Sequence, residues 1–147
     1  MIEANNIEKI LERQGFVISP VKGDSMLPML DENKDAVKIV PAVNVLEKYD
    51  LPLYRRPGGQ LVLHRIIEVK KKHYIICGDN RADLERDIAQ SDIVGMLEGF
   101  YQRDKYISRS DKEFLQYAKK AVRTLPIRRM KVFIYRVIRK LKRIISK

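Results

Sequence analysis

The chain has few of the residues that usually carry redox or metal chemistry. Its 147 residues include one cysteine, two histidines and no tryptophan. A single cysteine excludes a disulfide within the chain, which fits a reducing compartment. No Cys/His cluster has the spacing of a zinc site, so we expect neither a metal nor another cofactor. We expect Cys77 to be a small buried core residue.

Long apolar runs are also missing. No window reaches about 18 uninterrupted apolar residues, so the sequence predicts no membrane-spanning helix. The first 14 residues include Glu3, Glu8 and Glu12 and lack the apolar core of a secretory signal peptide. We therefore expect a cytoplasmic protein, or one that associates peripherally with a membrane.

Acidic residues are absent from the C-terminal part of the chain. From Lys119 to Lys147 there are twelve Lys or Arg residues and no Asp or Glu, while the whole chain carries a net charge of +11. The preceding 118 residues hold 18 basic and 19 acidic side chains and are close to neutral. Electrostatic attraction to any partner is therefore expected to be a property of the tail.

Most of the sequence predicts short strands separated by turns, after one N-terminal helix over residues 2–14 that Gly15 ends. Gly58-Gly59 marks a hairpin between two strands. Residues 81–90 are expected to be irregular or one short helix. This pattern is typical of an antiparallel β domain. The expected strands are 16–21, 36–40, 51–56, 60–69, 74–77 and 93–100, the last weakened by Gly95.

From Lys112 the apolar residues follow a helical period instead, with Pro126 expected to break or kink the run. Before the proline, one face holds Phe114, Leu115, Ala118 and Val122. After it, basic residues fill much of the face opposite an apolar stripe. We therefore expect a mainly β domain over residues 1–108 and a basic amphipathic helical extension over 109–147. The stripe consists of Ile127, Met130, Ile134, Val137, Ile138, Leu141 and Ile145.

The extension has three interpretations. It can lie on an anionic membrane surface, to which each Lys or Arg contributes on the order of 1 kcal/mol. It can bind nucleic acid with strong salt dependence, or it can pack its stripe on the body or on a partner. The apolar stripe is better suited to a membrane interface than to binding the phosphate backbone of a nucleic acid. We favour the membrane surface for residues 112–147 and place nucleic acid below it.

A serine in the segment Gly23-Asp24-Ser25-Met26-Leu27-Pro28 is the candidate nucleophile. Glycine and proline can hold one hydroxyl at a defined, exposed place, and a serine needs a base within hydrogen-bond reach. His64 can serve as that base, oriented by a carboxylate on its other ring nitrogen. The candidate acids after Gly78 are Asp79, Asp83, Glu85 and Asp87.

The order of four segments resembles that of type I signal peptidases. They are Ser25-Met26-Leu27-Pro28, Leu53-Tyr54-Arg55-Arg56, Leu63-His64-Arg65-Ile66-Ile67 and Gly78-Asp79-Asn80, and the resemblance covers roughly residues 17 to 100. The usual bacterial enzymes have lysine as the base. Histidine at this place is similar to the Ser-His branch of the endoplasmic reticulum and archaea. Repressor-cleaving relatives use lysine, which argues against that branch.

The resemblance implies a role for each site residue. Ser25 is the nucleophile, His64 the general base and Glu85 the orienting acid, because that branch has its acid six residues after the Asp of Gly-Asp-Asn. Asp83 and Asp87 are near alternatives. The family fold also implies an extended peptide or protein substrate beside the serine. Gly23, Asp24, Met26 and Pro28 then form the substrate-binding and oxyanion region, with the Ser25 N–H as oxyanion donor.

Two departures leave a second function open. The chain has 24 mostly polar residues where the family usually has an N-terminal membrane anchor, and Gly23 lacks the hydroxyl that often serves as a second oxyanion donor. The sequence therefore predicts a serine endopeptidase for leader, signal or pro-peptides. The alternative is a weak or inactive peptidase-like protein tethered to membrane or nucleic acid by its tail. We expect Asp79 to form a turn and His73 to be a solvated turn residue.

Overall fold

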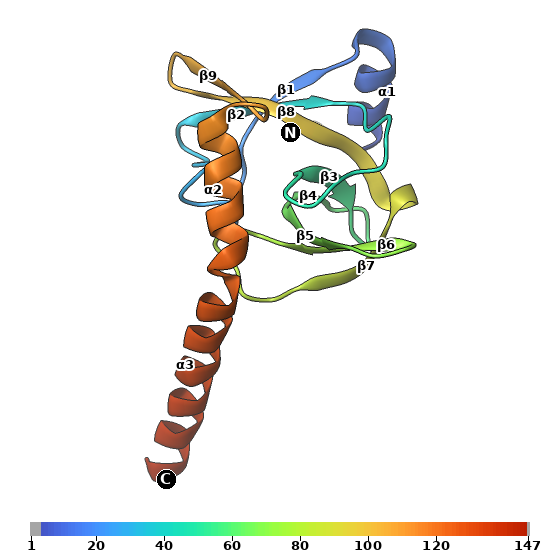
Figure 1. The fold of residues 1–147 in the computed structure, drawn as a ribbon. Helices are drawn as coiled ribbons and strands as arrows, with labels where there is room; N and C mark the ends of the chain where they lie inside the picture. The colour runs from blue at the N-terminus through green and yellow to red at the C-terminus, as the bar shows by residue number, and fades with distance from the viewer. Residues whose placement is uncertain (1–3, 147) are drawn as a thin grey trace.

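Two antiparallel sheets make up the β body in the computed structural model, which describes residues 4–146 (Figure 1). The expected mainly antiparallel β class, with a short helix before it and helices after it, is confirmed. The six-stranded sheet runs in the order β1 (Val17–Pro20), β2 (Asp35–Val40), β8 (Ile93–Gln102), β3 (Pro52–Arg55) and β4 (Leu61–Leu63), and β9 (Lys105–Ser108) pairs with β8. The three-stranded sheet contains β5 (Arg65–Val69), β6 (His73–Cys77) and β7 (Glu85–Ala89), and a 3-10 helix, η1 (Gln90–Asp92), follows it.

The N-terminal helix, α1 (Ala4–Gln14), lies where the sequence predicts it, although residues 2 and 3 of the prediction fall outside the described residues. Ile7 and Leu11 on its apolar face are buried in a hydrophobic cluster against the large sheet. Gly15 ends the helix with a φ of +77° and donates its N–H to the Leu11 carbonyl at 2.9 Å. A left-handed residue after the last turn favours glycine, which explains the stop at this position.

Two hydrophobic clusters hold the body together. The first packs α1 against the large sheet and includes Val37 and Ile39 of β2, which alternate with more exposed neighbours as a one-sided strand requires. The second cluster joins the two sheets through Tyr54 of β3, Ile66 of β5 and Ile76 of β6. The candidate site lies at this junction between the sheets.

Two predicted segments differ from the structure. Residues 60–69 form two strands in different sheets, because the chain leaves the large sheet after Leu63 and enters the small one at Arg65. Residues 81–90, expected to be irregular or helical, contain strand β7. Its charged residues have weak strand propensity, but pairing with β6 and burial of Ile88 outweigh that preference.

Strand β8 is longer than predicted, and Gly95 is a packing requirement in it. A Cβ at Gly95 would lie 2.7 Å from Ile39 Cγ2 and 2.8 Å from the Val40 carbonyl oxygen. No side chain fits there without moving β2. The glycine therefore permits the close approach of β8 to β2 that the sheet needs.

Helices α2 (Lys112–Arg123) and α3 (Leu125–Ile145) follow the sheets, with Thr124 between them. Pro126 stands in the first turn of α3, where a missing N–H leaves no helical hydrogen bond unmade. Helix α2 buries Phe114, Ala118 and Ala121, whereas Leu115, predicted on the same face, is 42% exposed. Helix α3 points away from the sheets (Figure 1). Within residues 4–146, none of the helices combines the length and the hydrophobicity that a membrane span requires.

Candidate active site

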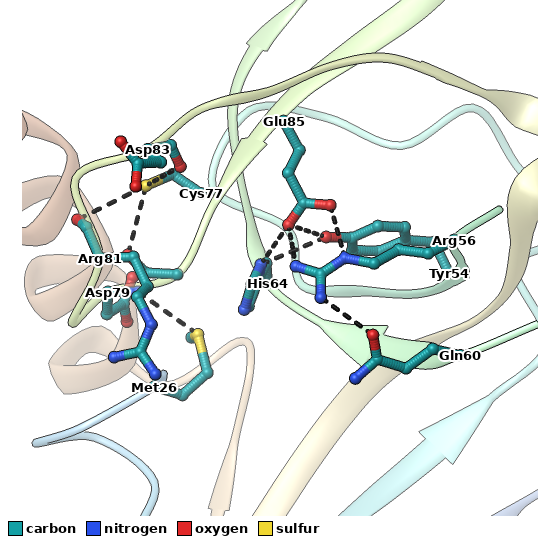
Figure 2. Close-up of polar contacts among 11 residues, drawn as sticks. Met26, Tyr54, Arg56, Gln60, His64, Cys77, Asp79, Arg81, Asp83 and Glu85 are labelled. Carbon is teal, nitrogen blue, oxygen red and sulfur yellow. Dashed lines mark hydrogen bonds and ion pairs between the residues drawn. The ribbon is translucent and has the colours of Figure 1, made fainter. Parts of the chain in front are cut away.

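His64 occupies the junction between β4 and β5 and is 5% exposed. Its Nδ1 lies 3.0 Å from Oε1 of Glu85 and 3.2 Å from the Tyr54 hydroxyl (Figure 2). An ionised carboxylate can only accept, so Nδ1 carries the proton and Nε2 carries the lone pair. The structure thus places Glu85 on the ring nitrogen where an orienting acid is expected.

Glu85 begins β7, and its carboxylate is held by Tyr54 of β3 and by Arg56, which directly follows that strand (Figure 2). The Tyr54 hydroxyl donates to Oε1 at 2.6 Å. Arg56 donates from Nε to Oε2 at 2.8 Å and from Nη2 to Oε1 at 2.5 Å. This bidentate ion pair fixes both oxygens of the carboxylate and hence the direction from which His64 is held.

The environment sets the protonation of this group of residues. Burial alone would raise the pKa of Glu85, but the hydrogen bonds from Arg56 and Tyr54 outweigh it and lower the pKa from 4.5 to about 2. Burial lowers the pKa of His64 below 6.5, although Glu85 opposes that effect. Burial and the bond to Glu85 raise the pKa of Tyr54. At neutral pH the site therefore combines a neutral imidazole with an ionised carboxylate.

The serine turn is held by the Gly78–Arg81 segment. The Asn80 N–H donates to the Ser25 carbonyl at 2.8 Å, and the Asn80 side-chain amide donates to the Asp24 carbonyl at 3.1 Å. Arg81 Nη2 pairs with Asp24 Oδ1 at 2.5 Å, and this hydrogen bond lowers the pKa of Asp24. Two predicted motifs are therefore joined directly in space, through residues such as Asp24 and Asn80 that lie 56 positions apart in sequence.

Gly78 is the point at which Ser25 and His64 meet. A Cβ built at Gly78 would lie 2.7 Å from the Ser25 carbonyl oxygen and 3.1 Å from His64 Nε2. The two residues therefore flank the same Cα, and any side chain there would press on both. Among residues 4–146, no hydrogen bond joins the Ser25 hydroxyl to His64, and the Ser25 N–H has no acceptor.

The other residues of the predicted substrate region shape the turn in different ways. Gly23 has a φ of +75°, which favours glycine, and donates its N–H to Glu32 Oε2 at 2.8 Å. Met26 is buried beneath the turn, where its Sδ accepts the Asp79 N–H at 3.5 Å. Pro28 is exposed. The role of these residues in holding substrate stays a prediction.

The alternative acids lie elsewhere. Asp83 faces Arg136 of α3, with Nη2 3.2 Å from Oδ2. Asp87 is 3.5 Å from Nε2 of His73, which is the first residue of β6 and not the solvated turn residue that was predicted. Of the three acids in the segment 83–87, Glu85 is the one in contact with His64.

Asp79 lies in a turn, as predicted, which the Arg81 N–H closes by donating to the Gly78 carbonyl at 3.0 Å, but its side chain does not bond its own backbone. Its carboxylate forms a buried bidentate ion pair with Arg65, whose Nε is 2.8 Å from Oδ1 and whose Nη2 is 2.7 Å from Oδ2. The Arg65 guanidinium also lies 5.6 Å and 5.7 Å from the ring centroids of Phe114 and Tyr117. Because Arg65 follows His64 and Asp79 follows Gly78, this pair fixes the backbone on both sides of the site.

Cys77 is buried at 1% exposure, as predicted, and burial raises its pKa to about 11. Its thiol is therefore protonated and unreactive at neutral pH. Among residues 4–146, no cluster of three or more His, Cys, Asp or Glu side chains is placed to hold a metal ion.

Sequence reasoning named His64 and Glu85 but missed the roles of Tyr54, Arg56 and Arg65. A signal was present: Tyr54-Arg55-Arg56 puts a phenol and two guanidinium groups at the end of an otherwise apolar strand. An arginine directly after His64, inside a strand rich in isoleucine, was a second such signal, because a buried guanidinium needs a carboxylate partner.

No protein-family model matches the chain, and neither the curated proteins nor the solved structures contain a match to it. The functional argument therefore depends on the geometry of the site and on the sequence motifs.

Proposed function

We propose that the protein is a serine endopeptidase that resembles type I signal peptidases. Ser25 is the nucleophile, His64 the general base and Glu85 the residue that positions the imidazole. One observation carries the proposal: a neutral imidazole, held at Nδ1 by an ionised Glu85, has its Nε2 beside the Ser25 turn across Gly78. Few structural roles require a buried histidine with this combination of partners.

In the proposed mechanism, the Ser25 Oγ attacks the peptide carbonyl carbon while His64 Nε2 accepts the hydroxyl proton. The resulting imidazolium is stabilised by Glu85, which stays ionised because its pKa is about 2. The C–N bond then breaks as Nε2 gives the proton to the leaving amine. Water attacks the acyl-enzyme in the same way and regenerates Ser25.

The tetrahedral oxygen needs a donor, and the Ser25 N–H, which has no acceptor in the described part of the chain, is the candidate. Gly23 has no side chain to supply a second donor. Because removal of one oxyanion donor typically costs about 10²–10³ in rate, we expect slow turnover.

The sheet edges support an extended peptide as the substrate. His64 lies between β4, the last strand of the large sheet, and β5, the first strand of the small one. The outer side of β4 has no backbone partner among residues 4–146, so a strand added along that edge would pass beside His64. The outer edge of β5 is already covered at Ile66, which accepts from the Tyr49 N–H at 3.0 Å and donates to the Asp50 carbonyl at 2.9 Å. Leader, signal or pro-peptides, which are cleaved in extended form, fit this arrangement.

A fluorophosphonate probe tests the nucleophile without knowledge of the substrate. The probe reacts with an activated serine, and we expect one adduct that mass spectrometry locates at Ser25. Ser25→Ala should abolish labelling, and the exposed Ser91→Ala should leave it unchanged. No labelling of the folded wild type, or labelling at another serine, would contradict the enzyme and favour the inactive, peptidase-like binding protein.

The pH dependence of labelling tests His64. Because burial lowers the pKa of His64, the base form persists below pH 6.5. The labelling rate is expected to reach a plateau at neutral and alkaline pH and to fall at lower pH with an apparent pKa below 6.5. A rate that keeps rising above pH 8 would point to a different base.

A further inference from the structure

The surface of helix α3 separates apolar and basic side chains around its circumference. With about 100° per residue, the exposed apolar side chains occupy an arc of about 140°. The basic side chains occupy the remaining arc together with Val132 and the 65% exposed Tyr135, and they border the apolar arc on both sides. The helix contains no Asp or Glu. The apolar set is Ile127, Met130, Phe133, Ile134, Val137, Ile138, Leu141, Ile144 and Ile145, exposed by 40–83%. The basic set is Arg128, Arg129, Lys131, Arg136, Arg139, Lys140, Lys142 and Arg143.

The contacts of α3 with the body are made from its basic side. Arg128 Nε donates to the Arg81 carbonyl at 3.2 Å, and Arg136 pairs with Asp83 at 3.2 Å. Leu125 is the buried residue of the helix. The apolar arc lies on the other side, and the body leaves it uncovered. Figure 1 shows that α3 extends away from the sheets.

An arc of nine large exposed apolar side chains on one helix is more than a protein surface usually leaves uncovered. The charge of α3 distinguishes between the two partners that could cover this arc, a second copy of the chain and a lipid surface. A second copy packed through the same arc would bring two helices together, each with eight positive charges and no acid to pair with them. An anionic lipid surface instead attracts the basic side chains that border the arc and accepts the apolar side chains below them.

We propose that α3 lies in the interface of an anionic membrane, with its apolar arc among the upper acyl chains and its bordering lysines and arginines at the headgroups. The 21-residue helix is about 30 Å long, so it presents several turns to the surface at once. Lys and Arg at the border can bury their methylenes and keep their charges at the phosphates. This inference does not depend on the proposed peptidase activity.

The bonds of Arg128 and Arg136 connect this surface to the site. Their partners, Arg81 and Asp83, belong to the segment between Gly78, which lies beside the Ser25 turn, and Glu85. A helix held in the membrane interface would therefore hold the β body, and its site, close to that surface. Substrates presented at the bilayer would meet the site there.

Vesicle flotation with the full-length chain tests the proposal. We expect binding to vesicles of phosphatidylcholine mixed with phosphatidylglycerol, weak binding to phosphatidylcholine alone, and weaker binding as salt rises. Ile134→Ser with Leu141→Ser should reduce the apparent partition coefficient by about tenfold or more. The matched control, Val43→Ser with Val45→Ser, changes two exposed apolar side chains of the body and should leave binding unchanged.

The charge is tested with Lys140→Gln and Lys142→Gln together, which border the apolar arc on its two sides, against Lys71→Gln and Lys72→Gln in the exposed β5–β6 turn. We expect about tenfold weaker binding for the first pair and no change for the second. Equal binding of all variants would overturn the proposal. Two other results would overturn it if they occurred without vesicle binding. One is dimerisation in sedimentation velocity that Leu141→Ser abolishes, and the other is binding to an oligonucleotide.

Discussion

Glu85 holds the site together because three side chains make four hydrogen bonds to its carboxylate. Its Oε1 accepts from His64, Tyr54 and Arg56, and its Oε2 accepts a second bond from Arg56. An acid that served only to orient a histidine would not need this many donors. The arrangement instead keeps the carboxylate ionised and immobile, which gives the histidine a fixed tautomer.

Glu85→Gln tests this dependence through stability. The pKa of Glu85 is lowered in the folded protein, so its stabilising contribution is complete above pH 4.5 and is lost as pH falls towards about 2. In urea unfolding, the wild type should lose about 2–3 kcal/mol more than Glu85→Gln across this range, since each pKa unit corresponds to about 1.4 kcal/mol. Asp83→Asn, which removes an exposed acid nearby, should lose as much unfolding free energy as the wild type across this pH range. An equal loss in wild type and Glu85→Gln would contradict the pairing.

Gly78 is the second residue on which the geometry depends. Gly78→Ala would put a methyl group 2.7 Å from the Ser25 carbonyl and 3.1 Å from His64 Nε2, so one of the two must move. We expect destabilisation of about 1–3 kcal/mol and at least about tenfold slower fluorophosphonate labelling. An unchanged labelling rate with unchanged melting temperature would show that Ser25 and His64 are not neighbours across this residue.

At the scale of elements, the break between β4 and β5 positions the histidine. The segment Leu61-Val62-Leu63-His64-Arg65-Ile66-Ile67 has continuous strand propensity, so local pattern alone predicts one strand. The change of sheet at His64 is set by tertiary packing, because Ile66 belongs to the core between the sheets. The presence of most strands was predictable from sequence, whereas the division of the strands between two sheets was not.

Strand β7 and the Arg65–Asp79 pair illustrate the same limit. Glu85-Arg86-Asp87 has the composition of a surface loop, and its strand conformation comes from pairing with β6. Asp79 follows a glycine and lies in the predicted turn, but the sequence does not show that its carboxylate pairs with Arg65, 14 residues earlier in the chain. The motifs correctly predicted that His64 and Glu85 are neighbours, whereas the residues that hold them could be identified only from the three-dimensional structure.

The Arg65–Asp79 pair joins β5, the Gly78–Arg81 turn and α2. Asp79→Asn would leave the fully buried Arg65 charge without its partner, and we expect a loss of about 3–5 kcal/mol in the free energy of unfolding. The control is Glu8→Gln, which breaks the exposed pair with Arg55 and should cost less than about 1 kcal/mol. Equal effects of the two substitutions would show that the buried pair does not anchor α2.

At the scale of the whole molecule, α3 and the β body are almost independent in packing. A chain that ends at Met130 keeps the buried Leu125 and the Arg128 bonds but loses the exposed remainder of α3. We expect its free energy of unfolding to stay within about 1 kcal/mol of the full-length value, because the lost Arg136–Asp83 pair is exposed. Leu125→Ala in the full chain should cost about 2–3 kcal/mol, and a truncation that costs more would reveal packing of α3 on the body.

The uneven charge of the chain gives the molecule a large electric dipole. The first 118 residues are nearly neutral, whereas the last 29 carry twelve positive charges. In the field of an anionic surface such a molecule turns before it touches, so that its C-terminal helix leads and the β body trails. This alignment acts only within a few Debye lengths, each about 8 Å at physiological ionic strength. If α3 binds an anionic membrane as proposed, the charge distribution would set the orientation in which the molecule arrives, and the apolar arc would set how long it stays bound.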